Sequence, residues 1–319
     1  TFIGAYVYAL TAIALREMGQ ISNDAATVSF FVTFLVLMAV VLSLIRWIFH
    51  LQTLGSLLNI ARQIEVATKD EVAARMEAPC MGGHKLEDKA QIPVGALPVT
   101  AQISGYITRI WAGDLNNLAS DLGTRIYVPL SVGSFVTAGT PLAFVAMDRK
   151  PQKVVDGWED RLRKQIPLKD VRSFAQDPRF GMLVMAEIAQ KALSPGINDP
   201  GSAVDVIHRQ ARLLMGFEKE VPKDKPPFPR VYLPEIPCEE MLEDAFEAIA
   251  RDGRDTVEVQ IELQKALAQL AHHPSANMCT AAKAMAQRFE QQALDVLTYT
   301  YDKDRLRRVC KGQEQHGDI

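Results

Sequence analysis

Residues 25–45 read AATVSFFVTFLVLMAVVLSLI, a run of 21 residues without a charged side chain that ends at Arg46. A helix of roughly 20 apolar residues crosses a bilayer core of about 30 Å, because each residue advances the helix by 1.5 Å. The length of the run therefore predicts a membrane span. Trp47 and Phe49, beside Arg46 and His50, are typical of an anchor at the membrane surface. The alternative is a central helix of a large soluble core.

A second apolar segment precedes this span. Residues 1–15, TFIGAYVYALTAIAL, carry no charge and end at Arg16, but they are too short to cross a bilayer comfortably alone. The short connection to residue 24 predicts an antiparallel hairpin, in which residues 1–15 form the second half of a span that begins earlier. A small excess of positive charge after residue 45 favours a cytoplasmic location for the rest of the chain.

Composition limits the function classes. With 319 residues, the chain is long enough for more than one domain, and a hydrophobic content of 48% is ordinary for a soluble protein, so the membrane signal is confined to one end. The formal net charge of −3 gives nucleic-acid binding no electrostatic support. The cysteines lie far apart and form no CxxC pattern, which favours neither a zinc site nor disulfides. They are Cys80, Cys238, Cys279 and Cys310.

The chain after the span changes character twice. Residues 51–75 repeat apolar side chains at helical spacing, and residues 79–95 read as a loop with glycine and proline. Residues 97–147 contain short runs rich in β-branched and aromatic residues, separated by glycine or proline. We predict four parts: transmembrane helices in 1–50, a helical stalk and loop in 51–95, a β module in 96–150, and an α-helical cytoplasmic domain in 151–319.

The β module resembles a known architecture. The pieces SGYI (104–107) and GSFVTAGTPL (133–142) are similar to the barrel-sandwich hybrid of biotinyl and lipoyl carrier domains. Carrier domains present a lysine in a hairpin between their two halves. Here residues 114–123 occupy that place as a predicted short helix, with Asp114 as N-cap and Gly123 at the C-terminal end, and they contain no lysine. We therefore expect a structural module and no swinging arm.

The last half predicts an all-helical bundle. A charged helix is expected over residues 152–165, and residues 180–192 and 200–215 form helices on either side of a Pro-Gly turn. Amphipathic helices follow at 239–252, 256–272 and 274–300, and the tail after Cys310 reads as frayed. The predicted fold class is a mainly α membrane protein with a transmembrane helical hairpin, a small barrel-sandwich-like β module and a C-terminal helical bundle.

Two segments carry a family resemblance. ALSPGINDP (192–200), preceded by RSFAQDPRFG (172–181), resembles a bacterial family of predicted multi-pass membrane proteins that share a domain of unknown function. The resemblance extends over essentially the whole chain and includes RVYLPEI (230–236). It implies further N-terminal spans, with residues 1–15 similar to the third of four, and an inner-membrane protein with a cytoplasmic soluble part. One departure is Gly201-Ser202, where members often have an aromatic residue and threonine.

The same segments hold the candidate site residues, which form a possible ligand-binding corner. They are Gln176, Asp177, Ser194, Pro195, Gly196, Asn198, Asp199 and Pro200. The favoured interpretation is a rigid helix–turn–helix corner, in which Asp199 caps the next helix. A hydrolytic group that uses Ser194, Asp205 and His208 is disfavoured, because triads are normally assembled from distant segments. An anion site at the helix start is the third interpretation, although Asp199 opposes it.

Two groups of histidine and cysteine occur in the sequence: Cys80 with His84, and His272 and His273 with Cys279. Neither group predicts a metal centre, and the sequence has no phosphate-binding glycine loop. We expect no cofactor, no metal and no enzymatic activity. The first hypothesis is a homo-oligomeric channel or transport-related protein, because few spans and a large soluble part resemble channels with a cytoplasmic assembly domain. Conduction would require several subunits, since one hairpin cannot enclose a pore. The alternative is a membrane-anchored sensor or scaffold, whose soluble domain binds an unknown small ligand or a partner.

Overall fold

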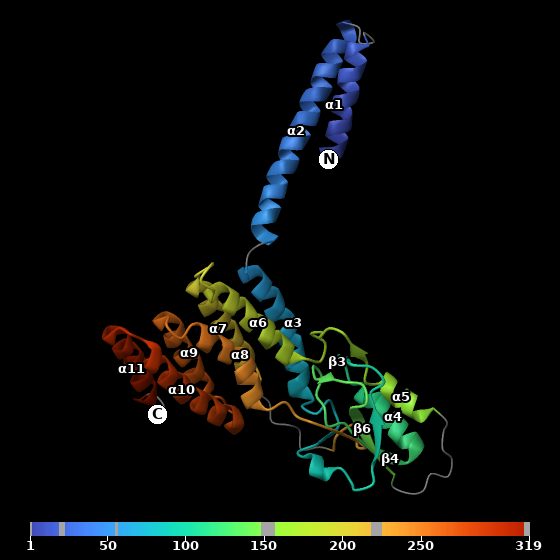
Figure 1. The fold of residues 1–319 in the computed structure, drawn as a ribbon, viewed down its shortest axis with the longest axis vertical. Helices are drawn as coiled ribbons and strands as arrows, with labels where there is room; N and C mark the ends of the chain where they lie inside the picture. Colours follow the sequence, from blue (N-terminus) through green and yellow to red (C-terminus); the bar gives the residue numbers. More distant parts are fainter. Residues whose placement is uncertain (1, 19–22, 55–56, 148–156, 218–224, 316–319) are drawn as a thin grey trace. The chain divides into compact units, whose positions relative to one another are not determined.

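The computed structural model describes residues 2–18, 23–54, 57–147, 157–217 and 225–315 (Figure 1). The chain divides into two compact units, residues 1–59 and residues 60–319. The division falls within the first turn of the helix that follows the long apolar helix. Each unit is described separately.

The first unit is a helical hairpin. Helix α1 (Phe2–Glu17) lies beside α2 (Asn23–Leu54), and the Tyr8 hydroxyl is 3.0 Å from the Thr33 hydroxyl (Figure 1). Within the described residues, Thr27–Phe49 is the one segment long and apolar enough to cross a membrane, and none of it is buried within the protein. The predicted span at residues 25–45 is therefore supported. A second complete span is not shown, because the 16 residues of α1 extend only about 24 Å.

The second unit contains two small sheets. The larger has the strand order β1-β8-β4-β6-β2, and the smaller has the order β5-β3-β7. The strands are β1 (His84–Lys85), β2 (Leu97–Thr100), β3 (Gly105–Ile107), β4 (Thr124–Tyr127), β5 (Phe135–Val136), β6 (Pro141–Met147), β7 (Leu168–Lys169) and β8 (Val231–Leu233). Gly133 and Gly139 have φ angles of 88° and 89°, as expected for glycines at turns.

The sheets differ from the expected module. Three strands come from outside residues 96–150: β1 lies in the predicted loop, and β7 lies in the predicted helical region. The third, β8, lies in residues 230–237, a proline-bounded piece for which the sequence predicts extended backbone. Strand β8 pairs in parallel with both β1 and β4, which supplies backbone partners along one side of β4. Val231 and Leu233 are fully buried in the core of this region. The barrel-sandwich hybrid is not shown.

Two helices near the sheets begin at other residues than the sequence predicts. Helix α4 (Ala112–Leu122) ends at Gly123, whose φ of 62° is the left-handed conformation expected there. Trp111 occupies the N-cap position, and Asp114 lies within the first turn, so the predicted cap was wrong. Helix α5 (Trp158–Lys164) is shorter than the predicted 152–165, and residues 152–156 lie outside the described part of the chain. The predicted loop also contains a short 3₁₀ turn at Lys89–Gln91.

The helices of residues 178–315 pack into a bundle, as predicted. They are α6 (Pro178–Leu193), α7 (Pro200–Met215), α8 (Cys238–Asp252), α9 (Val257–Leu270), α10 (Ala276–Val296) and α11 (Thr300–Gln315). Helix α3 (Leu57–Glu77) lies in the segment predicted as a stalk. Helix α11 extends past Cys310, where a frayed tail was expected, and Leu306 anchors it in a small apolar cluster with Val257. Helix α3 approaches α6 so closely that a Cβ atom on Gly181 would lie 1.9 Å from the Thr68 hydroxyl oxygen.

The span can be tested with a charge near its centre. Val36→Arg should reduce membrane insertion, because a charged side chain in the middle of a span costs about 2.5 to 3.5 kcal/mol on insertion scales. The measurement is the share of protein that stays in carbonate-washed membranes, with Val36→Leu as the control. Recovery of Val36→Arg at full yield as a soluble protein without detergent would show that residues 27–49 do not cross the bilayer.

Candidate functional site

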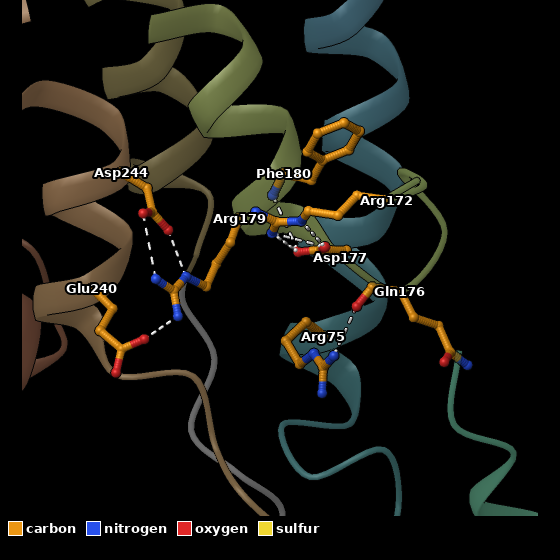
Figure 2. Close-up of polar contacts among 8 residues, drawn as sticks. All are labelled: Arg75, Arg172, Gln176, Asp177, Arg179, Phe180, Glu240 and Asp244. Carbon is orange, nitrogen blue, oxygen red and sulfur yellow. Dashed lines mark hydrogen bonds and ion pairs between the residues drawn. The ribbon is translucent and has the colours of Figure 1, made fainter. Parts of the chain in front are cut away.

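A buried carboxylate begins α6. Asp177 is the N-cap: its Oδ1 accepts a hydrogen bond of 3.1 Å from the backbone N–H of Phe180, and Pro178 occupies the first helical turn. Arg172 donates to the same carboxylate from Nε and Nη2, at 3.0 and 2.8 Å (Figure 2). The Asp177 side chain is 2% exposed. Burial raises the pKa of Asp177, and the Arg172 ion pair and the Phe180 N–H oppose that rise.

Gln176, one residue earlier, connects three parts of the second unit. Its backbone N–H donates to Glu71 Oε2 at 2.8 Å, and its carbonyl accepts from Arg75 Nη2 at 2.9 Å, so both groups are held by α3. Its side-chain Oε1 accepts from the backbone N–H of Ile110, beside the sheets, at 2.9 Å. The φ of Gln176 is 59°, which is uncommon for a residue with a side chain. These bonds hold the backbone in that conformation.

The sheet region also fits closely against the ion pair. A Cβ atom on Gly133 would lie 2.3 Å from Asp177 Oδ2 and 2.6 Å from Arg172 Nη2. Only glycine leaves room for the pair at this turn. We call the group formed by Glu71, Arg75, Arg172, Gln176 and Asp177 the polar junction.

Arg179, in the first turn of α6, reaches the opposite side of the helix. Its guanidinium pairs with Asp244 at 2.5 Å and with Glu240, both on α8 (Figure 2). These carboxylates raise the pKa of Arg179 against the effect of burial, which is the largest influence and lowers it. Residues 172–179 thereby connect α6 to its surroundings: Gln176 contacts α3 and the sheet region, and Arg179 contacts α8.

A cavity of about 760 Å³ lies beside the polar junction. Arg75 and Arg179 both line it, together with Lys85, which pairs with Glu235 at 2.8 Å. The first turns of α8 and α10 contribute Cys238, Glu239, Asn277 and Thr280. Its volume falls in the range of small-molecule sites, which is about 300–1,000 Å³.

Neither thiol near this cavity is set up as a nucleophile. Burial raises the pKa of Cys80 to about 11, and burial with the nearby Glu235 raises the pKa of Cys238. A thiol attacks as the thiolate, so both groups stay protonated and unreactive at neutral pH.

The predicted corner at residues 194–200 lies elsewhere. Asp199 caps α7 through Ser202, accepting from its N–H at 3.1 Å and its hydroxyl at 2.6 Å, and Pro200 is in the first turn. These bonds lower the pKa of Asp199. Asn198 has a φ of 49°, and its N–H donates to the Ser194 carbonyl at 2.8 Å. Pro195, Gly196 and Asn198 are exposed. This geometry is that of the helix–turn–helix corner we favoured.

The structure separates the predicted site residues into two groups. Gln176 and Asp177 precede α6, and residues 194–200 follow it, so about 24 Å of helix lies between them. The disfavoured triad residues also have separate partners. The Ser194 hydroxyl donates to the Lys191 carbonyl, Asp205 accepts from Arg209, and His208 is 3.0 Å from Glu262. They therefore do not form a hydrolytic arrangement in this structure.

Sequence reasoning missed Arg75, although a signal was present. The buried face of α3 runs through Ala61, Ile64, Thr68 and Val72, at spacings of three and four residues. Arg75 is the next position in that series and is 6% exposed. A charged residue in register with a buried stripe marks a position to inspect, because burying a charge is unfavourable without partners.

Gln176→Ala tests the polar junction. The change removes the acceptor of the Ile110 N–H, and an unpaired buried donor costs about 1–3 kcal/mol of unfolding free energy. Thermal or denaturant unfolding of the full chain in detergent measures the loss. Gln102→Ala is the control, because Gln102 is exposed and makes only a 3.4 Å bond to Asp160. Equal stability of both variants would contradict a structural role for the Gln176 amide.

Asp199→Ala tests the exposed corner. Loss of an N-cap should lower the free energy of unfolding by about 0.5–2 kcal/mol, whereas Asp199→Asn and Asp199→Ser should largely preserve it. The measurement combines thermal unfolding of the full chain with a cellular phenotype. If Asp199→Asn and Asp199→Ala both unfold like the parent and both lose function, the corner binds a ligand or reacts.

Comparison with known proteins identifies the chain's relatives. Uncharacterized proteins of Mycobacterium bovis and of Mycobacterium tuberculosis strain H37Rv are each 28% identical over 167 residues, which cover 52% of this chain and 32% of the relative. The chain thus matches about a third of the length of these curated relatives. No solved structure matches. Residues 1–269 match the family described as "Predicted membrane protein (DUF2254)". The chain belongs to this family of predicted membrane proteins of unknown function.

Proposed function

We propose that this protein is a membrane-anchored sensor or scaffold, and that its soluble part binds a ligand or partner and passes that state to the helix next to the membrane. In this proposal the protein is a multi-pass protein of the bacterial inner membrane, with residues 60–319 in the cytoplasm. No catalytic step is assigned to it. The lipid bilayer is its first partner.

The polar junction is the observation that carries the proposal. Glu71 and Arg75 belong to α3, which is the first helix after the membrane hairpin and includes the boundary between the two units. They hold the backbone of Gln176, whose amide also holds Ile110. A change at the sheets, at α6 or in the adjacent cavity would therefore act on α3 through hydrogen bonds to groups that are largely shielded from water.

The second candidate function is a homo-oligomeric channel or transport protein. It is favoured by the span itself, since none of its residues is buried within the protein, so the sides of α2 that α1 does not cover are free to face lipid or other copies. A pore would need several subunits, because a single hairpin encloses no channel.

Hydrogen exchange tests the coupling. Gln176→Ala removes the side-chain bond to Ile110 that helps to hold residue 176 in place, while its backbone can still bond to Glu71 and Arg75. In full-length protein in nanodiscs, the less firmly held backbone should speed exchange along α3 (residues 57–77) as well as at the start of α6. Gln102→Ala, on the exposed surface, should leave α3 unchanged. Faster exchange that stays confined to the loop before α6 would contradict transmission through α3.

A flux assay with the same protein separates the two functions. A sensor or scaffold should give liposomes no more permeability to K⁺ or Cl⁻ than protein-free liposomes have. Flux that depends on protein, together with a particle mass of several subunits, would overturn the proposal in favour of a channel.

A further inference from the structure

Arg75 is the unusual charge of the cavity beside the polar junction. It extends the apolar face of α3, it is 6% exposed, and it lines the 760 Å³ cavity. Its hydrogen bonds go to two backbone carbonyls, those of Gln176 at 2.9 Å and Pro79 at 3.4 Å. A guanidinium has five N–H donors and stays charged in proteins, so two carbonyls leave donors and a full charge to be balanced.

Within the described residues, no carboxylate oxygen lies within 4.0 Å of the Arg75 guanidinium. Burial is the largest influence on the pKa of Arg75 and lowers it, and the smaller effects of Cys80 and of two acids, Asp177 and Glu71, oppose it. Asp177 already accepts from Arg172 and Phe180, and Glu71 accepts from the Gln176 N–H. Both acids are therefore engaged by other donors in the polar junction, and within the described residues neither forms an ion pair with Arg75.

Two helix starts meet at the same cavity. Helices α8 and α10 have 15 and 21 residues, and neither has a side-chain hydrogen bond at its N-cap. Pro237, Cys238, Ser275 and Asn277, from these two ends, line the cavity. The first backbone N–H groups of a helix have no partner within the helix and carry a partial positive charge. Both helix starts therefore lie at the cavity that Arg75 also lines.

The acids of the cavity do not cancel this arrangement. Glu235 is paired with Lys85, and Glu240 is paired with Arg179. The other two, Glu87 and Glu239, are exposed and hydrated. Arg75 is therefore the one buried charge of the described lining, whereas the unpaired carboxylates, Glu87 and Glu239, are exposed.

We propose that this cavity binds the phosphate group of a small phosphorylated molecule, which pairs with Arg75. The proposal rests on the proposed function, in which the soluble part binds a ligand, and it gives that ligand its chemistry. Arginine recognises phosphate with two parallel hydrogen bonds, and helix starts supply further N–H donors to the remaining oxygens. A cavity of 760 Å³ has room for a phosphate together with the organic group it is attached to.

Calorimetric titration of the full chain in detergent tests the site. The probes are inorganic phosphate, glycerol 3-phosphate and dihexanoyl phosphatidate, with sodium acetate at equal ionic strength as the comparison. Glycerol 3-phosphate and phosphate should bind, and acetate should bind at least about tenfold more weakly, since it offers fewer oxygens to the donors. Binding of phosphatidate with no binding of glycerol 3-phosphate would assign the same phosphate site to a lipid headgroup.

Two variants locate the binding at this cavity. Arg75→Gln should weaken phosphate binding about tenfold or more, since the charged partner is lost. Because Arg75 also holds Gln176, a second variant leaves the polar junction untouched: Thr280→Glu puts a carboxylate into the cavity from an exposed position on α10. It should also weaken binding about tenfold or more. Gln287→Glu, an exposed position on the same helix that does not line the cavity, makes the same charge change and should bind like the parent.

Three results would overturn the proposal: no heat with any phosphate probe, acetate binding as tightly as phosphate, or unchanged affinity in Thr280→Glu. These outcomes are distinct from a failure of the proposed function. Phosphate binding with unchanged exchange along α3 in Gln176→Ala would keep the anion site and remove the coupling. Normal coupling without phosphate binding would keep the coupling and remove this ligand.

Discussion

The ion pair between Arg172 and Asp177 is the constraint on which the second unit depends. A carboxylate that is 2% exposed needs a partner and hydrogen bonds, because burying an isolated charge is strongly unfavourable. Arg172 and the first turn of α6 supply both. This arrangement sets where α6 begins, requires glycine at residue 133, and places Gln176 where its backbone meets α3. The sheets, α3 and α6 thus share one set of polar contacts.

Close backbone packing supports the same assembly. Gly181 lets α3 approach α6 at Thr68, and the buried Gln210 of α7 bonds to the carbonyls of Met182 and Ala245, at 3.1 and 2.9 Å. These two bonds satisfy the Nε2 of Gln210 and tie α7 to α6 and α8, whereas its Oε1 is buried without a hydrogen-bond partner among the described residues. Arg75 differs from Gln210 in carrying a full charge: it is a buried cation whose hydrogen bonds go to backbone carbonyls.

The β region illustrates why a local resemblance can mislead. The turn glycines at 133 and 139 adopt the expected conformations, yet the sheet is completed by Val231–Leu233, about 90 residues further along the chain. The flanking prolines indicate that residues 230–237 are extended, but the sequence gives no partner for them, because pairing depends on which edge of the sheet lacks one. The same reasoning applies to His84–Lys85, which pairs with that strand.

Sequence alone determined the features that depend on local chemistry. The span follows from the length of an uncharged run, the bounds of α7 follow from Asp199, Pro200 and an amphipathic period, and the end of α4 follows from Gly123. The family membership follows from the sequence as well. Only the tertiary structure decided the rest, because it depends on residues far apart in sequence. It separated Gln176 and Asp177 from residues 194–200 by the length of α6. It also brought the guanidinium of Arg75 to 2.9 Å from the carbonyl of Gln176, although the two residues are about 100 positions apart in the sequence. A buried charge is recognised by its surroundings, and the surroundings of Arg75 come from α3, α6, α8 and α10 together.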